Sequence, residues 1–223
     1  MRSYLKNLRD LSSKENKKDL NMLSNVIFTE TRIGYSNNQY VDRLVLFLRG
    51  TGCSLVKETG GCTFCGFYNA TNLGVKISDE EYIKQVRKIV NDKGFDISRY
   101  PIICIYNDGS MLREEEISFN ALIKIVQMLN GKNDIKKIVI ESRVEDITEE
   151  KLIKLKAATN KAIEIAVGFE SANPLIRDLC INKNFENNVF EVNCLLAKKL
   201  DINISKLKSQ SPFAITPGRL CEN

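Results

Sequence analysis

Residues 43–66 read "RLVLFLRGTGCSLVKETGGCTFCG" and join an apolar run to a glycine-rich loop that carries three cysteines. The run from Arg43 to Gly50 has the length and apolar character of a buried strand. The loop after it brings Cys53, Cys62 and Cys65 together, with glycines that let the backbone bend sharply. The stretch therefore predicts a strand that ends in a cluster of soft ligands.

Outward from this stretch, helical and strand patterns alternate along the chain. Ser78 and Glu81 form a capping box that begins a helix, and Gly94 follows its end. The run "PIICIY" at 101–106 is typical of a strand buried on both faces. The further elements expected are a helix at 118–130, a strand at 137–141, a helix at 148–158, a strand at 162–168, a helix beginning near Asn173-Pro174, a helix at 185–200 and a strand at 202–205. This alternation predicts an α/β fold with a parallel sheet, either doubly wound or a full or partial barrel.

Composition narrows the function classes. The 223 residues, 43% of them apolar, can form one sizeable core, and the net charge of +5 suits a polyanionic partner but is also common on enzymes. The chain has no histidine, which excludes Ser-His and Cys-His nucleophile pairs, Cys/His zinc sites and a histidine base. The N-terminal residues are polar and basic, and no apolar run is long enough to span a membrane, so we expect a cytoplasmic protein with reduced cysteines.

The three clustered cysteines predict a metal or cluster site. Eight residues separate Cys53 from Cys62, and two separate Cys62 from Cys65. A zinc ion would need a fourth ligand from a remote cysteine or a carboxylate, whereas a 4Fe-4S cluster can leave one iron open for chemistry. Three local cysteines without a fourth favour the open cluster. The other cysteines in predicted strands or helices, Cys104, Cys180 and Cys194, are expected to be small buried apolar side chains.

The loops that follow the predicted strands carry most of the remaining polar chemistry. In parallel sheets these loops form the active face. They read "NDGS" at 107–110, "SRVED" at 142–146 and "FESAN" at 169–173. Taken alone, each has an ordinary explanation as a turn or an ion pair at the rim.

Together the motifs resemble the radical S-adenosylmethionine (SAM) superfamily, and within it the archaeosine-forming enzymes and the elongator catalytic subunits. The resemblance rests on "RGTGC", "GGCTFCGFYNAT", "YNDGSML", "IESRVEDIT" and "VGFESAN" and covers residues 43–200. The eight residues between the first two cysteines depart from the common spacing of three and mark a divergent branch. The resemblance implies a partial (β/α) barrel, a 4Fe-4S cluster on Cys53, Cys62 and Cys65, and reductive cleavage of SAM to a 5′-deoxyadenosyl radical.

The resemblance also implies partners for SAM at the strand ends. Asp108, with Gly109 and Ser110 in the same turn, suits the ammonium group, and Arg143 suits the methionine carboxylate. The remaining candidates are Glu141 and Glu170 for the ribose hydroxyls and Phe64 for the adenine, while Lys183 occupies a family-like position and no catalytic residue is assigned. A flavodoxin or ferredoxin would supply electrons, and a tRNA nucleoside is the substrate that this branch suggests.

The termini depart from the resemblance. We expect an extension at 1–40, the core domain at 41–205 and an irregular tail at 206–223. Only about four units and a fifth strand of the family's roughly six are recognisable, so we expect an incomplete barrel that is marginally stable and self-associates. The alternative function is a non-catalytic, zinc-binding module or an inactive remnant of such an enzyme.

Overall fold

The expected alternation of strands and helices forms one open sheet with helices along one side. A computed structural model describes residues 2–15, 22–183 and 185–207, and in it six strands follow the order β1-β2-β3-β4-β5-β6. The strands are β1 (Phe28–Ser36), β2 (Gln39–Phe47), β3 (Ile102–Tyr106), β4 (Lys137–Ser142), β5 (Ala162–Gly168) and β6 (Asn203–Leu207). All neighbours from β2 to β6 are parallel, which confirms the predicted parallel sheet and partial barrel.

One helix precedes β1 in the chain, and the other helices connect the parallel strands, as right-handed crossovers require. They are α1 (Arg2–Glu15), α2 (Ser54–Thr59), α3 (Asp79–Val90), α4 (Phe119–Asn130), α5 (Glu149–Ala158) and α6 (Asn187–Lys199). Shorter turns are the 3-10 helices η2 (Phe67–Ala70), η3 (Ile97–Arg99) and η4 (Val144–Asp146) and the π-helix η5 (Ile176–Ile181). The predicted N-cap is present, since the Ser78 side chain accepts from Glu81 N, and Ser118 and Thr148 cap α4 and α5 in the same way. The expectation that Gly94 follows the end of α3 is wrong, because this helix ends at Val90 and Asn91 is its C-cap.

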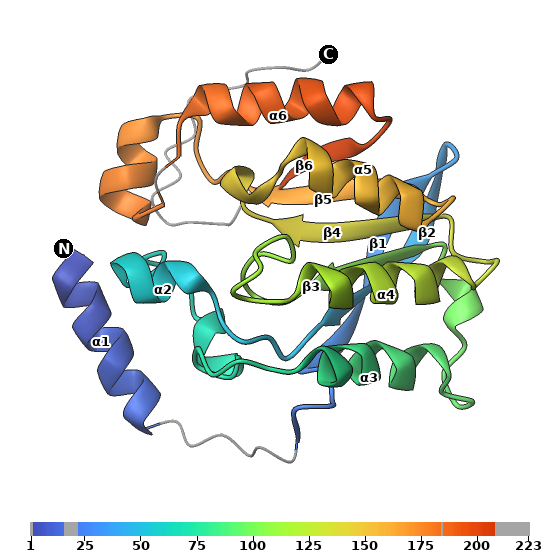
Figure 1. The fold of residues 1–223 in the computed structure, drawn as a ribbon, viewed down its shortest axis with the longest axis horizontal. Coiled ribbons are helices and arrows are strands. Elements are labelled where there is room, and N and C mark those ends of the chain that lie inside the picture. Colours follow the sequence, from blue (N-terminus) through green and yellow to red (C-terminus); the bar gives the residue numbers. More distant parts are fainter. Residues whose placement is uncertain (1, 16–21, 184, 208–223) are drawn as a thin grey trace.

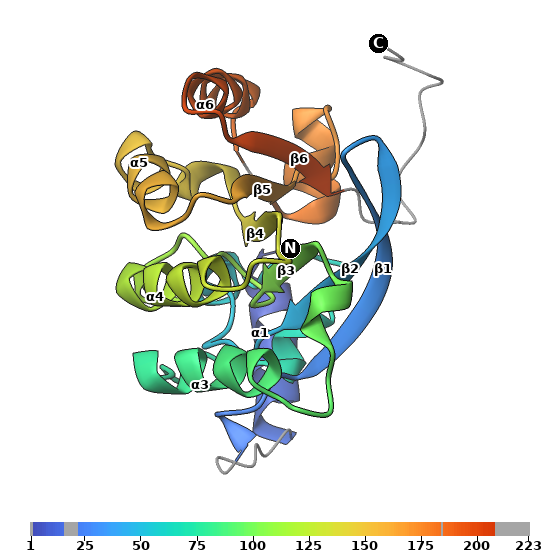
Figure 2. The same cartoon turned by 90° about the vertical axis from the view of Figure 1, so that its right-hand side faces the viewer.

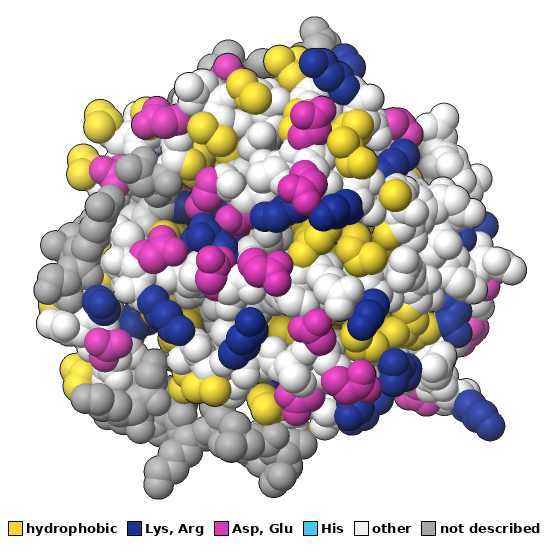
Figure 3. Space-filling view, viewed as in Figure 1, with side chains coloured by type: hydrophobic (Ala, Val, Ile, Leu, Met, Phe, Trp, Pro, Cys, Tyr) yellow, Lys and Arg dark blue, Asp and Glu magenta, His cyan; other side chains and the backbone are white. Residues whose placement is uncertain are grey.

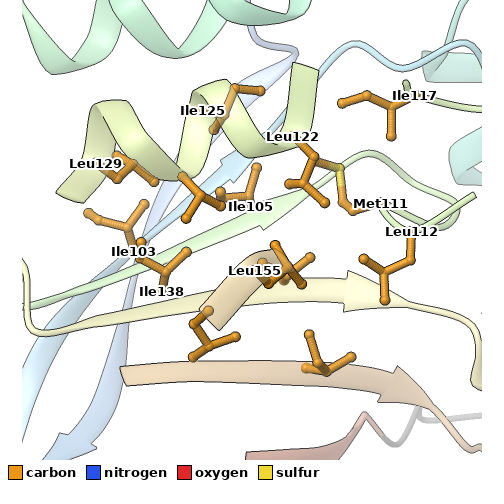
Figure 4. Close-up of a cluster of buried hydrophobic side chains, with 14 of the residues drawn as sticks. Ile103, Ile105, Met111, Leu112, Ile117, Leu122, Ile125, Leu129, Ile138 and Leu155 are labelled. Atoms are coloured by element: carbon orange, nitrogen blue, oxygen red, sulfur yellow. The ribbon is translucent and has the colours of Figure 1, made fainter. Parts of the chain in front are cut away.

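The main core fills the space between the sheet and helices α3 to α6, which lie side by side on one face (Figure 2). Figure 4 shows Leu122 and Leu129 of α4 on the side of the helix that faces Ile103 and Ile105 of β3, and Ile125 of α4 belongs to the same buried cluster. All five side chains are fully buried, so this face anchors the sheet rigidly. The strand ends that carry the site are therefore held on a well-packed scaffold.

One strand lies outside the core that the sequence predicted. The division at residue 41 assigned 1–40 to an extension, but β1 pairs with β2 along its whole length as an antiparallel edge strand. Asn37 and Asn38 connect the two strands with φ of 50° and 59°, the left-handed pair that a two-residue hairpin of type I′ requires. Because β1 is antiparallel to β2, its first residue lies at the C-terminal edge of the parallel strands.

The C-terminal ends of the parallel strands point toward the side where α1, α2 and η5 lie (Figure 1). The expected strand at 202–205 is β6, which continues to Leu207, and the rest of the expected tail, 208–223, lies outside the described residues. On the face shown in Figure 3, acidic and basic side chains are interspersed over the helices. No patch of basic side chains alone therefore marks a binding surface for a polyanion on that face. No helix in the described ranges is both long and apolar enough to cross a bilayer.

Candidate active site at the strand ends

The cysteine loop contains a short helix that the sequence did not predict. Cys53 is the N-cap of α2, and Gly60 ends the helix with φ of 88°, a left-handed conformation that favours glycine. Gly61 follows with φ of 78°, and Cys62 and Cys65 come next in a tight turn in which Cys65 N donates to Cys62 O at 3.1 Å. Helix α2 thus separates the first cysteine from the other two.

Segment η5 holds the second half of this loop from one side. The amide of Asn182 donates to Thr59 O at 3.0 Å and to Gly61 O at 2.8 Å. Thr63 donates from its backbone N to Ile181 O at 3.0 Å and from its hydroxyl to Cys180 O at 2.7 Å. Residues far apart in the sequence therefore fix the path of the backbone around Cys62.

Helix α1 holds the same loop from the other side. The Arg9 guanidinium donates from Nη2 to Cys62 O at 3.2 Å and also to Cys65 O. Gly60 lies directly against the backbone of α1, where a Cβ would overlap Leu5 and Lys6. The helix from the expected extension is thus in contact with two of the three candidate ligands.

Glu116 joins the cysteine loop to the "NDGS" turn. Its Oε1 accepts from Ser54 N at 2.8 Å and Ser54 Oγ at 3.0 Å, and its Oε2 accepts from Ser110 N at 2.7 Å. Gly109 is required beside it, because a Cβ there would overlap the Glu116 carboxylate. Burial raises the pKa of Glu116 to about 7, against the opposing effect of these hydrogen bonds. Glu116 is a site residue that sequence reasoning missed, since nothing local distinguishes it from Glu114 and Glu115.

The strand ends and the cysteine loop enclose one cavity of about 350 Å³, a volume in the range of small-molecule sites. Every metal-site candidate and nearly every SAM-contact candidate lines it: Cys53, Cys62, Phe64, Cys65, Asp108, Gly109, Glu141, Arg143 and Glu170. Ser110 does not line it, because its hydroxyl is fully buried between Ser142 Oγ (3.3 Å) and Arg143 N (3.2 Å). Ser110 therefore supports the backbone of Arg143.

Arg143 offers hydrogen-bond donors that no group in the described ranges uses. Its Nε lies 3.2 Å from Glu145 Oε1 and 3.4 Å from Asp146 Oδ2. The residue is only 4% exposed, and both Nη1 and Nη2 are buried without a hydrogen-bond partner. Buried donors of a guanidinium are costly to leave unpaired, so this side chain is suited to an anionic ligand in the cavity.

Two carboxyl groups face the same space as Arg143. Burial raises the pKa of Asp108 to about 7. Burial, reinforced by the neighbouring Asp108 charge, raises the pKa of Glu141 to about 8. Asp108 has φ of 57° and Glu170 has φ of 60°, a strained conformation for side-chain-bearing residues that is concentrated at functional sites. A bound cation would favour the ionised form of either carboxyl group.

Lys183 is another charged residue that lines the cavity. Its Nζ lies 3.4 Å from Glu170 Oε1, and both side chains are largely buried. Gly168 makes room for this pair, because a Cβ there would overlap Lys183 Nζ. The Lys183 charge also acts to lower the pKa of Cys62, which places the ammonium near the thiol. Sequence reasoning gave Lys183 a low weight because an isolated lysine in a loop has no local signal.

The prediction that Cys104, Cys180 and Cys194 are buried is confirmed for Cys104 and wrong for Cys180. Cys104 is fully buried in β3, as expected for a small apolar side chain. Cys180 is exposed, so the expectation that it would be buried is wrong; it lies on the outer side of η5. Cys194 on α6 is half-buried.

The donor set fits a cluster with several iron atoms. Burial raises the pKa of the Cys53 thiol well above its usual range and that of Cys62 to about 11, and coordination by a cation reverses such shifts. Within the described part of the chain, no three His, Cys, Asp or Glu side chains surround a single point as one metal ion requires. A 4Fe-4S cluster takes its thiolates on separate iron atoms, so three cysteines that line one cavity suit it.

Comparison with known proteins agrees with this geometry. The sequence profile of the radical SAM superfamily matches residues 49–205. An uncharacterized protein from Methanocaldococcus jannaschii is 32% identical over 96% of this chain and 59% of its own length. An archaeosine synthase subunit beta from Methanosarcina acetivorans is 27% identical over 84% of this chain and 53% of its own length. The chain thus spans little more than half the length of these relatives.

A solved structure shares the fold. A queuine lyase from Clostridium spiroforme, bound to SAM and queuine, superposes with a TM-score of 0.50 over 82% of each chain, at 17% identity. At this identity the likeness concerns the fold alone.

Proposed function

This chain belongs to the radical SAM superfamily, and on that premise we propose that Cys53, Cys62 and Cys65 bind a 4Fe-4S cluster with one iron open for SAM. Family membership makes the protein an enzyme whose cofactors are the cluster and SAM. When bound, the reduced cluster supplies one electron that cleaves the sulfonium of SAM to methionine and a 5′-deoxyadenosyl radical. We extend the proposal to a cytoplasmic location, because cysteines stay reduced there and can accept iron.

The residues of the cavity supply binding and orientation. The observation that carries the proposal is the pair of buried, unpartnered Nη atoms of Arg143 in the same cavity as the three cysteines. Arg143 binds the methionine carboxylate through this planar fork, and Asp108 accepts from the ammonium group. Glu141 and Glu170 serve the ribose hydroxyls, the backbone at Phe64 meets the adenine, and Ser110 supports Arg143 through its backbone N.

The substrate that we propose is a nucleoside in tRNA. The similarity to a protein named archaeosine synthase subunit beta supports this class, and the net charge of +5 suits a polyanion. The same name describes one subunit of an assembly, so we extend the proposal to a protein partner. This chemistry requires a one-electron donor, for which we propose a protein such as a flavodoxin or a ferredoxin.

Anaerobic reconstitution with iron and sulfide tests the cluster assignment. We expect a brown protein whose Cys53→Ala, Cys62→Ala and Cys65→Ala variants each lose stable cluster, because each removes one of three ligands. Cys104→Ala is the matched control, since Cys104 is buried in β3 and does not line the cavity. The second readout is 5′-deoxyadenosine formed from SAM under a strong reductant.

Two results would contradict the proposal. Equal loss of cluster in Cys104→Ala would show that the ligands are misassigned. A colourless protein that contains zinc and takes up no cluster would instead support a non-catalytic zinc-binding module.

A further inference from the structure

The cavity has a second wall that the SAM contacts do not use. Phe28, Phe47 and Tyr106 line the same cavity as the cysteines, together with Arg32. Of these four residues, only Tyr106 lies within residues 49–205, which match the superfamily profile. Most of this wall therefore comes from outside the matched part of the chain. We call these three rings and Arg32 the aromatic wall.

The sheet register places the three rings in one row. Phe28 is the direct partner of Phe47 across β1 and β2, and Phe47 is the direct partner of Tyr106 across β2 and β3. The row lies at the C-terminal edge because β1 is antiparallel, which brings its first residue beside the last residues of β2 and β3. Glu141, on the next strand β4, lines the same cavity.

The rings of this row are packed against one another with one end left open. Phe28 and Phe47 are stacked, with centroids 4.1 Å apart and planes 19° apart. Tyr106 meets Phe47 edge to face, with centroids 5.7 Å apart. Phe47 and Tyr106 are buried, whereas Phe28 is 44% exposed and has ring surface free to contact a ligand.

A cation borders the rings. The Arg32 guanidinium lies 5.7 Å from the centroid of Phe47 and is held by Glu30 Oε2 at 2.6 Å. One carboxylate partner leaves most of its five donors available, and its side chain is 39% exposed. Aromatic faces beside an arginine are the arrangement with which proteins bind unstacked nucleobases and their phosphates.

From this geometry we propose that the aromatic wall is the substrate subsite, where the planar base of a nucleotide stacks on Phe28 beside Arg32. The inference rests on the proposed function and deepens it, because it names the part of the cavity that holds the substrate base. The occupant is a planar ring with an adjacent anionic group, since the wall offers π surface and one cation. An apolar protein segment would cover the rings but leave the Arg32 donors that Glu30 does not use without an acceptor.

Equilibrium dialysis with the reconstituted protein tests the subsite, under anaerobic conditions without reductant and at saturating SAM. The dialysed probes are guanosine 5′-monophosphate and ribose 5-phosphate, and an unmodified tRNA transcript, whose mass is similar to that of the protein, is tested by filter binding in the same buffer. Phe28→Leu keeps an apolar side chain but removes the ring, so binding of the nucleotide or the transcript should weaken about fivefold or more. Phe28→Tyr should restore it, and ribose 5-phosphate should bind weakly to all forms.

Tyr35→Leu is the matched control. Tyr35 is an exposed aromatic residue on the same strand, but it packs against Tyr40 at the hairpin and does not line the cavity. Binding by this variant should stay within about twofold of the parent, since its ring offers no stacking surface in the cavity.

Each outcome decides the inference. Binding of the nucleotide alone or of the transcript alone supports the subsite and identifies the source of the base. No binding of either probe, equal binding by Phe28→Leu, or an equal loss in Tyr35→Leu would overturn it. Loss of SAM affinity in Phe28→Leu would also overturn it, because the wall would then hold the adenine of SAM. Failure of the wild-type protein to cleave SAM would count against the proposed function instead, since base binding is measured without turnover.

Discussion

Arg143 shows how one residue combines support and recognition. Its Nε bonds to Glu145 and Asp146 and fixes the side chain, while its two Nη atoms remain for a ligand. Arg143→Lys keeps the charge but removes the planar fork, so SAM should bind roughly tenfold more weakly while the iron content stays unchanged. Isothermal titration of SAM onto the reconstituted protein measures this change.

The control for that prediction is Arg113→Lys. Arg113 also pairs with Asp146, with Nε 2.8 Å from Oδ1, but it does not line the cavity. SAM affinity should therefore be retained in this variant. Unchanged affinity in Arg143→Lys would remove Arg143 from the binding site.

The raised pKa of Glu141 predicts that the stability of the metal-free protein depends on pH. Its pKa rises from 4.5 to about 8 on folding because of burial and the Asp108 charge. Between these values the folded state holds more protons than the unfolded state, so stability falls as pH rises through the window. The loss is on the order of a few kcal/mol.

Glu141→Gln should flatten this profile, which urea unfolding between about pH 5 and 9 would reveal. A residual slope should remain from Asp108 and Glu116, because burial raises the pKa of each to about 7. Glu115→Gln is the control, because Glu115 is exposed and should leave the slope unaltered. A profile for Glu141→Gln that parallels the wild type would argue against a buried, protonated Glu141.

At the scale of elements, two segments from distant parts of the chain position the cysteine loop. Helix α1 contributes Arg9, and η5 is followed by Asn182, which has φ of 59° and bonds to Thr59 O and Gly61 O. The geometry of the loop therefore depends on these two neighbours.

Arg9→Gln should loosen the loop around Cys62 and Cys65, because two charge-assisted bonds to their carbonyl oxygens are weakened. We expect the reconstituted cluster to bleach in air several-fold faster than in the wild type, followed by visible absorbance and iron content. Lys6→Gln removes a charge from the exposed side of the same helix and should bleach at the wild-type rate. Equal rates for Arg9→Gln and wild type would show that α1 does not protect the site.

At the scale of the molecule, the sheet has an edge at β6 that bears on assembly. Among the described residues β6 pairs with β5 only, so its other side offers backbone groups to a further strand. Nearby, α6 exposes Val192 and Leu195, and the preceding segment exposes Leu175 and Leu179. An open edge beside apolar side chains favours association between chains.

We therefore expect this chain to self-associate above its monomer mass of 25.3 kDa in size-exclusion chromatography with light scattering. Leu195→Lys should shift the distribution toward monomer, since it places a charge among these exposed side chains. Ile33→Lys, at an exposed position on the opposite edge strand, should not. A monomer at every concentration would contradict the expectation.

Regular elements with strong local patterns were predictable from the sequence. The apolar runs of β3, β4 and β5 and the capped, amphipathic helices α3 and α4 follow the expected bounds closely, because burial and capping leave a periodic record. β1 was missed because its side chains alternate between half-buried and exposed and include Ile33 and Tyr35 on the outer face. The adjacent asparagines at 37 and 38 were its one local signal.

By itself the sequence determined the parallel α/β sheet, the cysteine cluster and the strand-end loops that line the cavity, because each depends on residue type and spacing within a short segment. Tertiary structure decided what surrounds them: the Glu116 link, the Arg9 and Asn182 contacts with the cysteine loop, the orphaned donors of Arg143 and the aromatic wall. These features join residues up to more than a hundred positions apart. Their partners are set by strand register and chain crossings, and no local pattern records them.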